Sequence, residues 1–180
     1  MDIGMIGLGR MGGNMAERLL LGGHRVVVNN RSRDPIDEYA AKGAVPAYTV
    51  EDLVKQLQPP RAVWIMVPAG EATENMIERV VGLLGRGDTI VEGGNSMYKD
   101  SIRRAAAVKA RGVQYVDAGT SGGIWGLKIG YCLMVGGDRD AVEPLEPIFR
   151  TLAPEDGYAH VGPSGAGHFV KMIHNGIEYG

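Results

Sequence analysis

The C-terminal stretch of the 180-residue chain carries polar side chains whose types could perform acid–base chemistry. A lysine is followed three, four and seven positions later by three further polar residues: Lys171, His174, Asn175 and Glu178. A helix would place all four side chains on one face. The apolar side chains between them are expected on the opposite side, against the protein: Phe169, Val170, Ile173 and Ile177.

Lys171 and Glu178 are the candidate catalytic residues of this stretch. A lysine can act as a base when burial lowers its pKa, and a carboxyl group can act as an acid. The alternative interpretation is a solvated face joined by ion pairs. Gly176 favours a site, because a glycine weakens an exposed helix without any local benefit.

A glycine-rich turn near the N-terminus has the spacing of a phosphate-binding loop, Gly7-Leu8-Gly9-Arg10-Met11-Gly12. In such a loop the first glycine makes the tight turn, the second lets the backbone approach a pyrophosphate, and the third allows close helix packing. The N-terminus of the following helix would offer free N–H groups to the anion. The position after a predicted strand favours a dinucleotide site over an ordinary glycine-rich turn.

The end of the second predicted strand bears on the choice of cofactor. Domains that bind NAD hold the ribose 2′-hydroxyl with an acidic residue at this place. Here the strand is followed by Asn30, Arg31 and Ser32, without a carboxylate. Arg31 offers a planar cation suited to a 2′-phosphate, which favours NADP over NAD. The alternative is that Arg31 lies on a solvated loop, and NAD remains possible.

Three further glycine-bearing segments follow predicted strands: Met66-Val67-Pro68-Ala69-Gly70, Glu92-Gly93-Gly94-Asn95-Ser96 and Gly119-Thr120-Ser121-Gly122-Gly123. Loops at the carboxyl ends of strands gather around the ligand crevice of an open α/β sheet. Asn95, Ser96 and Ser121 are neutral hydrogen-bonding groups suited to a polyhydroxylated substrate or a nicotinamide ribose. Each segment alone could be an ordinary turn, but together they favour a binding site.

Short apolar runs alternate along the chain with longer segments of helical period, which is typical of βαβ units. Strands are expected at 2–6, 25–29, 62–67, 89–92, 113–117, 131–135 and 159–161. Helices are expected at 14–21, 35–42, 51–58, 71–84, 98–111, 141–152 and from 166 onward. The pattern predicts an α/β protein with a Rossmann-type, doubly wound, mostly parallel sheet.

The formal net charge of −2 gives the chain no general attraction to nucleic acid or membrane surfaces. A phosphorylated substrate must therefore meet local cations. The longest apolar stretch, 62–70, is far shorter than the ~20 residues that span a bilayer, and the N-terminus lacks signal-peptide features, so a cytoplasmic protein is expected. The single cysteine, Cys132, is expected to be a buried packing residue, with a reactive thiol as the alternative, and no metal site is expected.

These motifs together resemble the decarboxylating 6-phosphogluconate dehydrogenases over the whole chain. The resemblance is carried by the glycine loop, by Asn30-Arg31-Ser32, by the three glycine-bearing segments, and by the terminal Lys171, His174, Asn175, Glu178 and Tyr179. The residues after the Ser-Gly-Gly turn, including Trp125-Gly126, resemble the shorter-chain branch. That branch includes NAD users as well as NADP users.

The resemblance implies oxidation of 6-phosphogluconate at C3 with reduction of NADP, then loss of CO2 to give ribulose 5-phosphate, a step of the pentose phosphate pathway. Lys171 would take the proton of the C3 hydroxyl, and Glu178 would protonate C1 of the enediol. Substrate binding is implied for Asn95, Ser121, Gly122, Gly123, His174, Asn175 and Tyr179. Cofactor binding is implied for Gly7, Leu8, Gly9, Arg10, Met11, Gly12, Asn30, Arg31, Ser32, Val67, Pro68, Ala69 and Asn95.

The family also implies a large helical domain after this segment. We expect residues 1–165 to form the dinucleotide-binding domain and 166–180 to begin the catalytic helix, with the helical domain absent. Such a chain would bind NADP with little activity of its own, and the full-length protein would be a homodimer or homotetramer. Two alternatives are a 3-hydroxyisobutyrate or related β-hydroxyacid dehydrogenase, which also has a lysine–asparagine pair, and a non-catalytic NADP-binding module. His174 and Glu178-Tyr179 favour the sugar acid.

Overall fold

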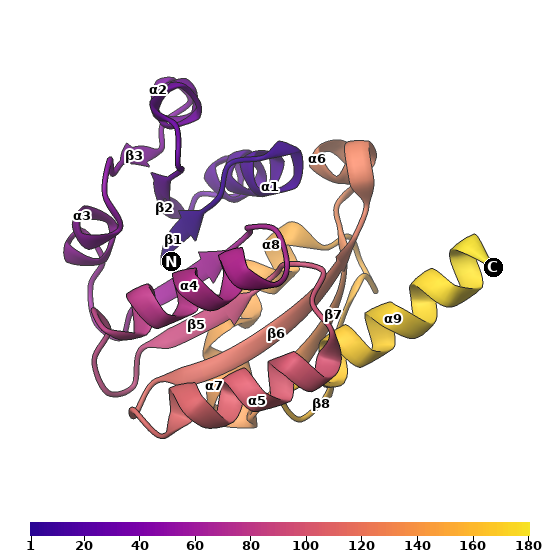
Figure 1. Ribbon diagram of the computed structural model, residues 1–180. Coiled ribbons are helices and arrows are strands. Elements are labelled where there is room, and N and C mark those ends of the chain that lie inside the picture. The colour runs from indigo at the N-terminus through magenta and orange to yellow at the C-terminus, as the bar shows by residue number, and fades with distance from the viewer.

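The computed structural model describes residues 1–180, and its centre is a single eight-stranded sheet (Figure 1). The strand order is β3-β2-β1-β4-β5-β6-β7-β8, and every pair is parallel except β6 with β7. The strands are β1 (Asp2–Ile6), β2 (Arg25–Asn29), β3 (Val45–Pro46), β4 (Ala62–Ile65), β5 (Thr89–Glu92), β6 (Gln114–Ser121), β7 (Cys132–Gly137) and β8 (Tyr158–Gly162). The expected mostly parallel Rossmann-type sheet is confirmed.

Helices cover both faces of this sheet, which makes the fold doubly wound. The α-helices are α1 (Arg10–Leu21), α2 (Arg33–Ala41), α3 (Val50–Lys55), α4 (Glu71–Val81), α5 (Tyr98–Lys109), α6 (Gly126–Ile129), α7 (Arg139–Val142), α8 (Glu146–Leu152) and α9 (Ala166–Tyr179). Two 3-10 turns, η1 (Gly123–Trp125) and η2 (Glu143–Leu145), complete the series. None of the helices is long and apolar enough to cross a membrane.

Each face of the sheet has its own hydrophobic core. One core joins Met15 and Leu19 of α1 and Phe149 of α8 to Trp64 of β4, whose ring lies edge-on to Phe149. The other core joins Leu53 of α3 and buried residues of α4 and α5 to the opposite side of the strands. Burial on both faces explains why the central strands are almost continuously apolar.

Most predicted elements are present, and the differences have local causes. The sequence does not predict β3, because two residues ending in a proline give no alternation signal. The single helix expected at 141–152 is divided into α7, η2 and α8, with Pro144 and Pro147 at the starts of the later pieces. The strand expected to end at residue 117 continues to Ser121, since it pairs with β7 over that length.

The orientation predicted for the final helix is wrong. The apolar residues Phe169, Ile173 and Ile177 are exposed, Ile177 by 79%, while Lys171 is only partly accessible. The helix packs on β6, β7 and β8, and its buried residues lie in its first turn. Beyond that turn α9 extends away from the body of the molecule, as Figure 1 shows. Its polar side therefore faces the sheet, and its apolar side faces outward.

The prediction that Cys132 is buried is also wrong, because Cys132 is exposed. Strand β7 runs antiparallel to β6, so its first residue pairs with Ser121, the last residue of β6. The cysteine therefore lies at the carboxyl edge of the parallel strands, where the sheet ends. The remaining residues of β7 are buried, as expected for a strand inside a sheet.

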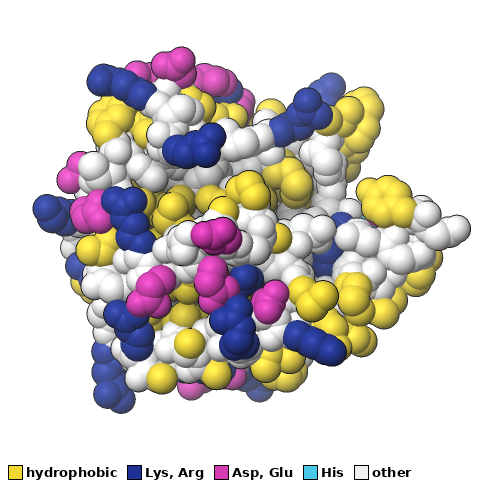
Figure 2. Space-filling view, in the orientation of Figure 1, with side chains coloured by type: hydrophobic (Ala, Val, Ile, Leu, Met, Phe, Trp, Pro, Cys, Tyr) yellow, Lys and Arg dark blue, Asp and Glu magenta, His cyan; other side chains and the backbone are white.

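An ion-pair cluster joins α4 to α5, on a face where acidic and basic side chains lie interspersed in Figure 2. The Glu74 carboxylate accepts hydrogen bonds from Arg103, at 2.8 and 2.9 Å, and from Nε of the buried Arg104, at 2.7 Å. The bonds from Arg103, with those from Arg104, lower the pKa of Glu74 to about 2. Arg104 also donates to Ser96 Oγ, so the cluster reaches the loop after β5.

We expect Glu74→Gln to lower the free energy of unfolding by about 1 kcal/mol at pH 7, a value that allows for solvent screening of this partly exposed carboxylate. Because the pKa of Glu74 is lower in the folded state, its ionised carboxylate stabilises that state at pH values above the ordinary glutamate pKa of 4.5. This stabilisation is lost as the pH falls toward 2. Urea unfolding at several pH values should therefore show a difference between the two proteins that shrinks across this window.

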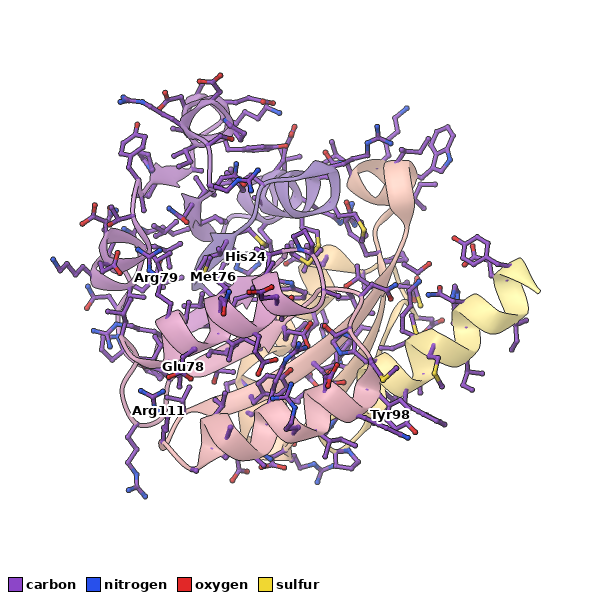
Figure 3. The ribbon with its side chains drawn as sticks, in the orientation of Figure 1. His24, Met76, Glu78, Arg79, Tyr98 and Arg111 are labelled. Carbon is purple, nitrogen blue, oxygen red and sulfur yellow. The ribbon has the colours of Figure 1, made fainter.

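Glu78→Gln is the matched control, since Glu78 lies on the same helix and accepts from Arg111 at 2.8 Å (Figure 3). Its side chain is 78% exposed, so the loss should stay below about 0.5 kcal/mol. Equal losses for the two variants, or a difference that persists at pH 2, would contradict the interpretation.

Candidate functional site

A cavity of about 640 Å³ lies at the carboxyl edge of β1, β2 and β4. It is lined by backbone and side chains from four of the loops that leave this edge. The lining residues are Ile6, Gly7, Gly9, Asn29, Asn30, Arg31, Ser32, Tyr48, Thr49, Val50, Met66, Val67, Pro68, Ala72, Met76 and Arg79. The lining includes seven of the predicted cofactor residues, from the glycine loop, the end of β2 and the loop after β4.

The three glycines of the first loop have distinct geometries. Gly7 has a φ of +96°, a left-handed conformation that favours glycine, and an added Cβ would overlap the carbonyl of Met66. A Cβ on Gly12 would overlap the carbonyl of Gly7, so this glycine lets α1 pack against the turn. A Cβ on Gly9 would meet nothing within 4 Å. The space beside Gly9 is open toward the cavity, as close approach of a ligand to the backbone requires.

The loop is held in place by the end of β2. The Leu8 N–H donates to Oδ1 of Asn30 at 3.0 Å, and the amide of Asn30 donates to Ser32. The Leu8 side chain is buried in the core, so neither its N–H nor its side chain faces a ligand. Helix α1 begins without a side-chain cap and without an acidic residue in its first turn. Its N-terminus therefore keeps N–H groups and positive potential for an anion.

The arginines near the rim of the cavity differ in how they are paired. Arg33 binds Asp37 at 3.1 Å and lies over the Tyr48 ring, and Arg79 binds both oxygens of the Glu51 carboxylate. Arg31 takes part in none of the ion pairs and is exposed at the cavity. The lining contains no carboxylate. The arrangement leaves Arg31 free to meet a further negative charge on a ligand.

Several lining residues carry no signal in the sequence. Tyr48 and Thr49 belong to the connection between β3 and α3, and Val50 begins α3. Sequence patterns do not place this connection, because β3 itself gives no periodic signal. Met76 and Arg79 project from α4 on the side that faces α3 (Figure 3). They stand three positions apart, on one helix face, which is a pattern that an ordinary amphipathic helix also has.

Other predicted cofactor residues lie outside this lining: Leu8, Arg10, Met11, Gly12, Ala69 and Asn95. Leu8 and Gly12 shape the loop from within, as described above. Asn95 is exposed in the loop after β5, and Ser121 is the last residue of β6, followed by Gly122 and Gly123. Because β4, β5 and β6 are parallel neighbours, these segments leave the sheet at the same edge.

Helix α9 lies beside this edge and carries the predicted catalytic residues. An added Cβ on Gly119 of β6 would lie 2.6 Å from Cβ of Lys171, so the lysine stem rests on the strand. Burial lowers the pKa of Lys171, and the charges of Glu178 and Cys132 act in the opposite direction. A lysine with a lowered pKa gives up its proton more readily, as a base at neutral pH must.

Further along the helix the polar side chains become more accessible. Nδ1 of His174 lies 3.4 Å from the carboxylate of Glu178, one turn later. Oδ1 of Asn175 is buried without a hydrogen-bond partner in the protein. Tyr179 is 80% exposed near the end of the helix. In Figure 2 a recess separates this part of the chain from the region of α6.

No group of three or more His, Cys, Asp or Glu side chains is arranged to hold a metal ion.

The open space beside Gly9 leads to a test that separates binding from folding. We expect Gly9→Val to weaken binding of a dinucleotide at least about tenfold, because the new side chain occupies the space next to the loop. The free protein has room for it, so the melting temperature should stay within about 2 °C. Calorimetric titration and thermal unfolding measure the two quantities. Gly85→Ala, remote from the cavity, is the control, and unchanged affinity in Gly9→Val would place the ligand elsewhere.

Comparison with known proteins agrees with this geometry. The family described as the NAD binding domain of 6-phosphogluconate dehydrogenase matches residues 2–162. A putative 6-phosphogluconate dehydrogenase, YqeC of Bacillus subtilis, is 48% identical over 180 residues, which are 100% of this chain and 60% of the relative. The NAD(+)-dependent, decarboxylating 6-phosphogluconate dehydrogenase of Haloferax volcanii is 45% identical over 99% of this chain and 59% of its own length. The chain thus spans about 60% of the length of these relatives.

Among solved structures, the 6-phosphogluconate dehydrogenase of Plasmodium falciparum superposes with a TM-score of 0.93 and 33% sequence identity. The superposition covers 99% of this chain and 40% of that protein, which was described without ligand, with its cofactor NADP+ and with its substrate 6-phosphogluconate. The fold of this chain is thus a known arrangement. The chain belongs to the 6-phosphogluconate dehydrogenase family and comprises the NAD-binding domain of that family.

Proposed function

We propose that this chain binds NADP and contributes the catalytic helix of an enzyme that converts 6-phosphogluconate to ribulose 5-phosphate and CO2. The observation that carries the proposal is the position of Lys171, half-buried on β6 at the edge where the cofactor loops end. The relatives named above support the substrate, since they are described as 6-phosphogluconate dehydrogenases. Because the chain spans only part of their length, the activity is a proposal for the protein that contains it.

The residues of the cavity fit a dinucleotide. The open space at Gly9 and the uncapped start of α1 suit a pyrophosphate, and the unpaired Arg31 suits a 2′-phosphate. When bound, the nicotinamide supplies the chemistry of hydride acceptance from C3 of the substrate. We assign the loop residues Gly7 to Gly12, Asn30 to Ser32 and Val67 to Ala69 to the cofactor site, with Asn95 between cofactor and substrate. Within the loop, Leu8 and Gly12 shape the turn and do not contact the ligand themselves.

Lys171 acts as the base of the proposed reaction. Its amine, made less basic by burial, accepts the proton of the C3 hydroxyl as C3 becomes a ketone. The resulting lysine ammonium then donates to the ketone oxygen and stabilises negative charge there while the C1 carboxylate leaves as CO2. The enediol that remains has five carbons, and its C1 is the former C2 of 6-phosphogluconate. Glu178, seven positions along the same helix face, donates a proton to this C1. The Lys171 proton returns to solvent and the Glu178 proton is regained from it.

The remaining polar groups hold the substrate in our proposal. Asn95, at the end of β5, and the turn from Ser121 to Gly123, at the end of β6, offer hydrogen bonds to its hydroxyl and carboxylate groups. His174 and Asn175 lie on the same side of α9 as Lys171 and orient the substrate, and the buried Oδ1 of Asn175 has no protein partner to compete for it. Tyr179, near the outer end of the helix, reaches the phosphate.

We further propose that residues 1–165 form the cofactor domain, that 166–180 begin the helix leading to a helical domain, and that the complete enzyme is a homodimer or homotetramer. Calorimetry with NADP and NAD, beside a spectrophotometric assay of reduced cofactor, tests the function. The assay uses the protein encoded by the complete gene, with 6-phosphogluconate and 3-hydroxyisobutyrate as substrates. Turnover of the second acid alone would establish a β-hydroxyacid dehydrogenase, and cofactor binding without turnover of either would establish a non-catalytic module.

Cofactor preference depends on Arg31 in this proposal. We expect Arg31→Gln to weaken NADP binding by about ten- to a hundredfold and to leave NAD binding nearly unchanged, because the charge-assisted contact to the 2′-phosphate is lost. Arg33→Gln is the matched control, since Arg33 is already paired with Asp37 and stacked on Tyr48. Equal losses of NADP and NAD affinity in Arg31→Gln would rule out a 2′-phosphate contact.

Loss of the base should abolish turnover without affecting the cofactor. In the protein encoded by the complete gene, we expect Lys171→Met to lower kcat with 6-phosphogluconate at least about a thousandfold. NADP affinity should change by less than about twofold, because the Lys171 side chain packs against β6 and lies outside the lining of the cofactor cavity. Lys55→Met, at the end of α3, serves as the control. Activity of Lys171→Met within about tenfold of the parent would refute the assignment.

A further inference from the structure

The Lys171 side chain lies directly on strand β6, at a position where the strand has no side chain. A Cβ on Gly119 would come within 2.6 Å of Lys171 Cβ and 2.8 Å of the Gly167 carbonyl oxygen. Contacts this short do not occur between real side chains and backbone, so α9 can approach β6 only because residue 119 is glycine. Gly119 lies within a regular strand and does not have a positive φ. Its role here is therefore the absence of a side chain rather than an unusual backbone conformation.

Asp117 lies two positions earlier on β6, so its side chain points to the same face of the sheet as residue 119. Its carboxylate is completely buried. One oxygen accepts from the Gly165 N–H at 2.7 Å, and the other accepts from the His168 N–H at 3.0 Å. Gly165 and His168 bracket the first turn of α9, which has no side-chain cap of its own. A strand residue thus supplies the negative group that the N-terminus of this helix needs.

Two further glycines make the contact between α9 and the sheet tight. A Cβ on Gly167 would overlap the carbonyl of Met134 and lie 2.6 Å from the carbonyl oxygen of Asp117. A Cβ on Gly136 of β7 would lie 2.7 Å from both the Asp117 carboxylate and the Gly167 nitrogen. The first turn of α9 therefore lies so close to β6 and β7 that no side chain fits between them at these positions.

His168, three positions before Lys171, fixes the rotation of the helix from another side. It is 1% exposed, and its Nδ1 lies 2.7 Å from the Ser101 hydroxyl of α5 and 3.5 Å from the Glu92 carboxylate of β5. The Glu92 carboxylate in turn accepts from Ser96 and Tyr115. Residues three apart project from adjacent places on a helix, so a fixed His168 also fixes where Lys171 leaves the helix.

We propose that Asp117 and Gly119 are positioning residues for Lys171. Asp117 holds the first turn of α9 in one register, and Gly119 provides the space in which the Lys171 stem lies. The inference rests on the proposed role of Lys171 as the base, since the position of its amine matters for turnover only in that role. Misplacement of a reacting group by about 1 Å costs on the order of a hundredfold in rate. An enzyme that uses Lys171 as its base therefore needs residues that hold this side chain in position.

The variants Gly119→Ala and Asp117→Asn test the proposal in the chain as it stands. Alanine is compatible with the backbone of a strand, so Gly119→Ala changes only the space that β6 leaves for α9 at Lys171 and Gly167. Asp117→Asn keeps the shape of the side chain and replaces one accepting oxygen with an amide donor. Gly176→Ala, on the same helix, is the matched control, because its new Cβ would meet nothing within 4 Å.

The readout is the titration of the Lys171 amine by NMR on ¹³C-methylated lysines, with the signal assigned by its loss in Lys171→Arg. In the parent and in Gly176→Ala the pKa of Lys171 should lie below the ordinary lysine value of 10.5. In Gly119→Ala and Asp117→Asn it should rise toward that value, because the displaced amine gains contact with water. NADP affinity should stay within about twofold of the parent in all of these variants.

A merely structural role for the two residues gives a different result. Lower melting temperatures with an unchanged Lys171 titration in both variants would overturn the proposal. If Asp117→Asn does not fold, Gly119→Ala decides the question alone. The titration needs no turnover, so the result stands or falls independently of whether 6-phosphogluconate is the substrate.

Discussion

The parallel register of β2, β1, β4, β5 and β6 is the constraint on which the rest of the structure depends. Each strand pairs with its neighbour so that all of them end at one edge. The connections that leave this edge are therefore neighbours in space, although they come from residues as far apart as Gly7 and Ser121. Helix α1, the cofactor cavity and the polar end of β6 all depend on this shared edge.

The reversal after β6 adds the second half of the site. Because β7 runs antiparallel to β6, the chain returns along the sheet and then reaches α9 through β8. The first turns of α9 thus pack on β6, β7 and β8 beside α5, and its later turns extend past the body of the molecule. Its polar side faces the carboxyl edge, which puts an amine, an imidazole and a carboxylate within reach of a ligand held by the loops.

Much of this can be predicted from the sequence, where local chemistry and fold agree. The glycine loop predicts its own geometry, since Gly7, Gly9 and Gly12 have the turn, the open space and the close packing that their spacing indicates. The strands that are buried on both faces are recognisable from their apolar runs. The residues of the β3–α3 connection cannot be recognised from the sequence, because the short strand that places Tyr48 carries no periodic signal.

The error in α9 has a more general cause. Helical spacing separates the polar and apolar sides of a helix, but it does not say which of them faces the protein. The usual assumption is that the apolar side does, and at a binding site the assumption fails. Burial of Gly167 and His168, rather than of Phe169 or Ile173, determines the orientation, and only the backbone contacts with β6 and β7 reveal it.

The strand order also bears on how the two halves of the site assemble. In the cofactor half, Gly4 of β1 pairs with Val63 of β4, so a segment of 59 positions, from 4 to 63, must close. In the other half, Ser121 pairs with Cys132, across 11 positions, from 121 to 132. The chain entropy of closing the longer loop exceeds that of the shorter one by about 1.5 kcal/mol. During folding, the surface that receives α9 therefore forms at lower entropic cost than the edge that receives the dinucleotide.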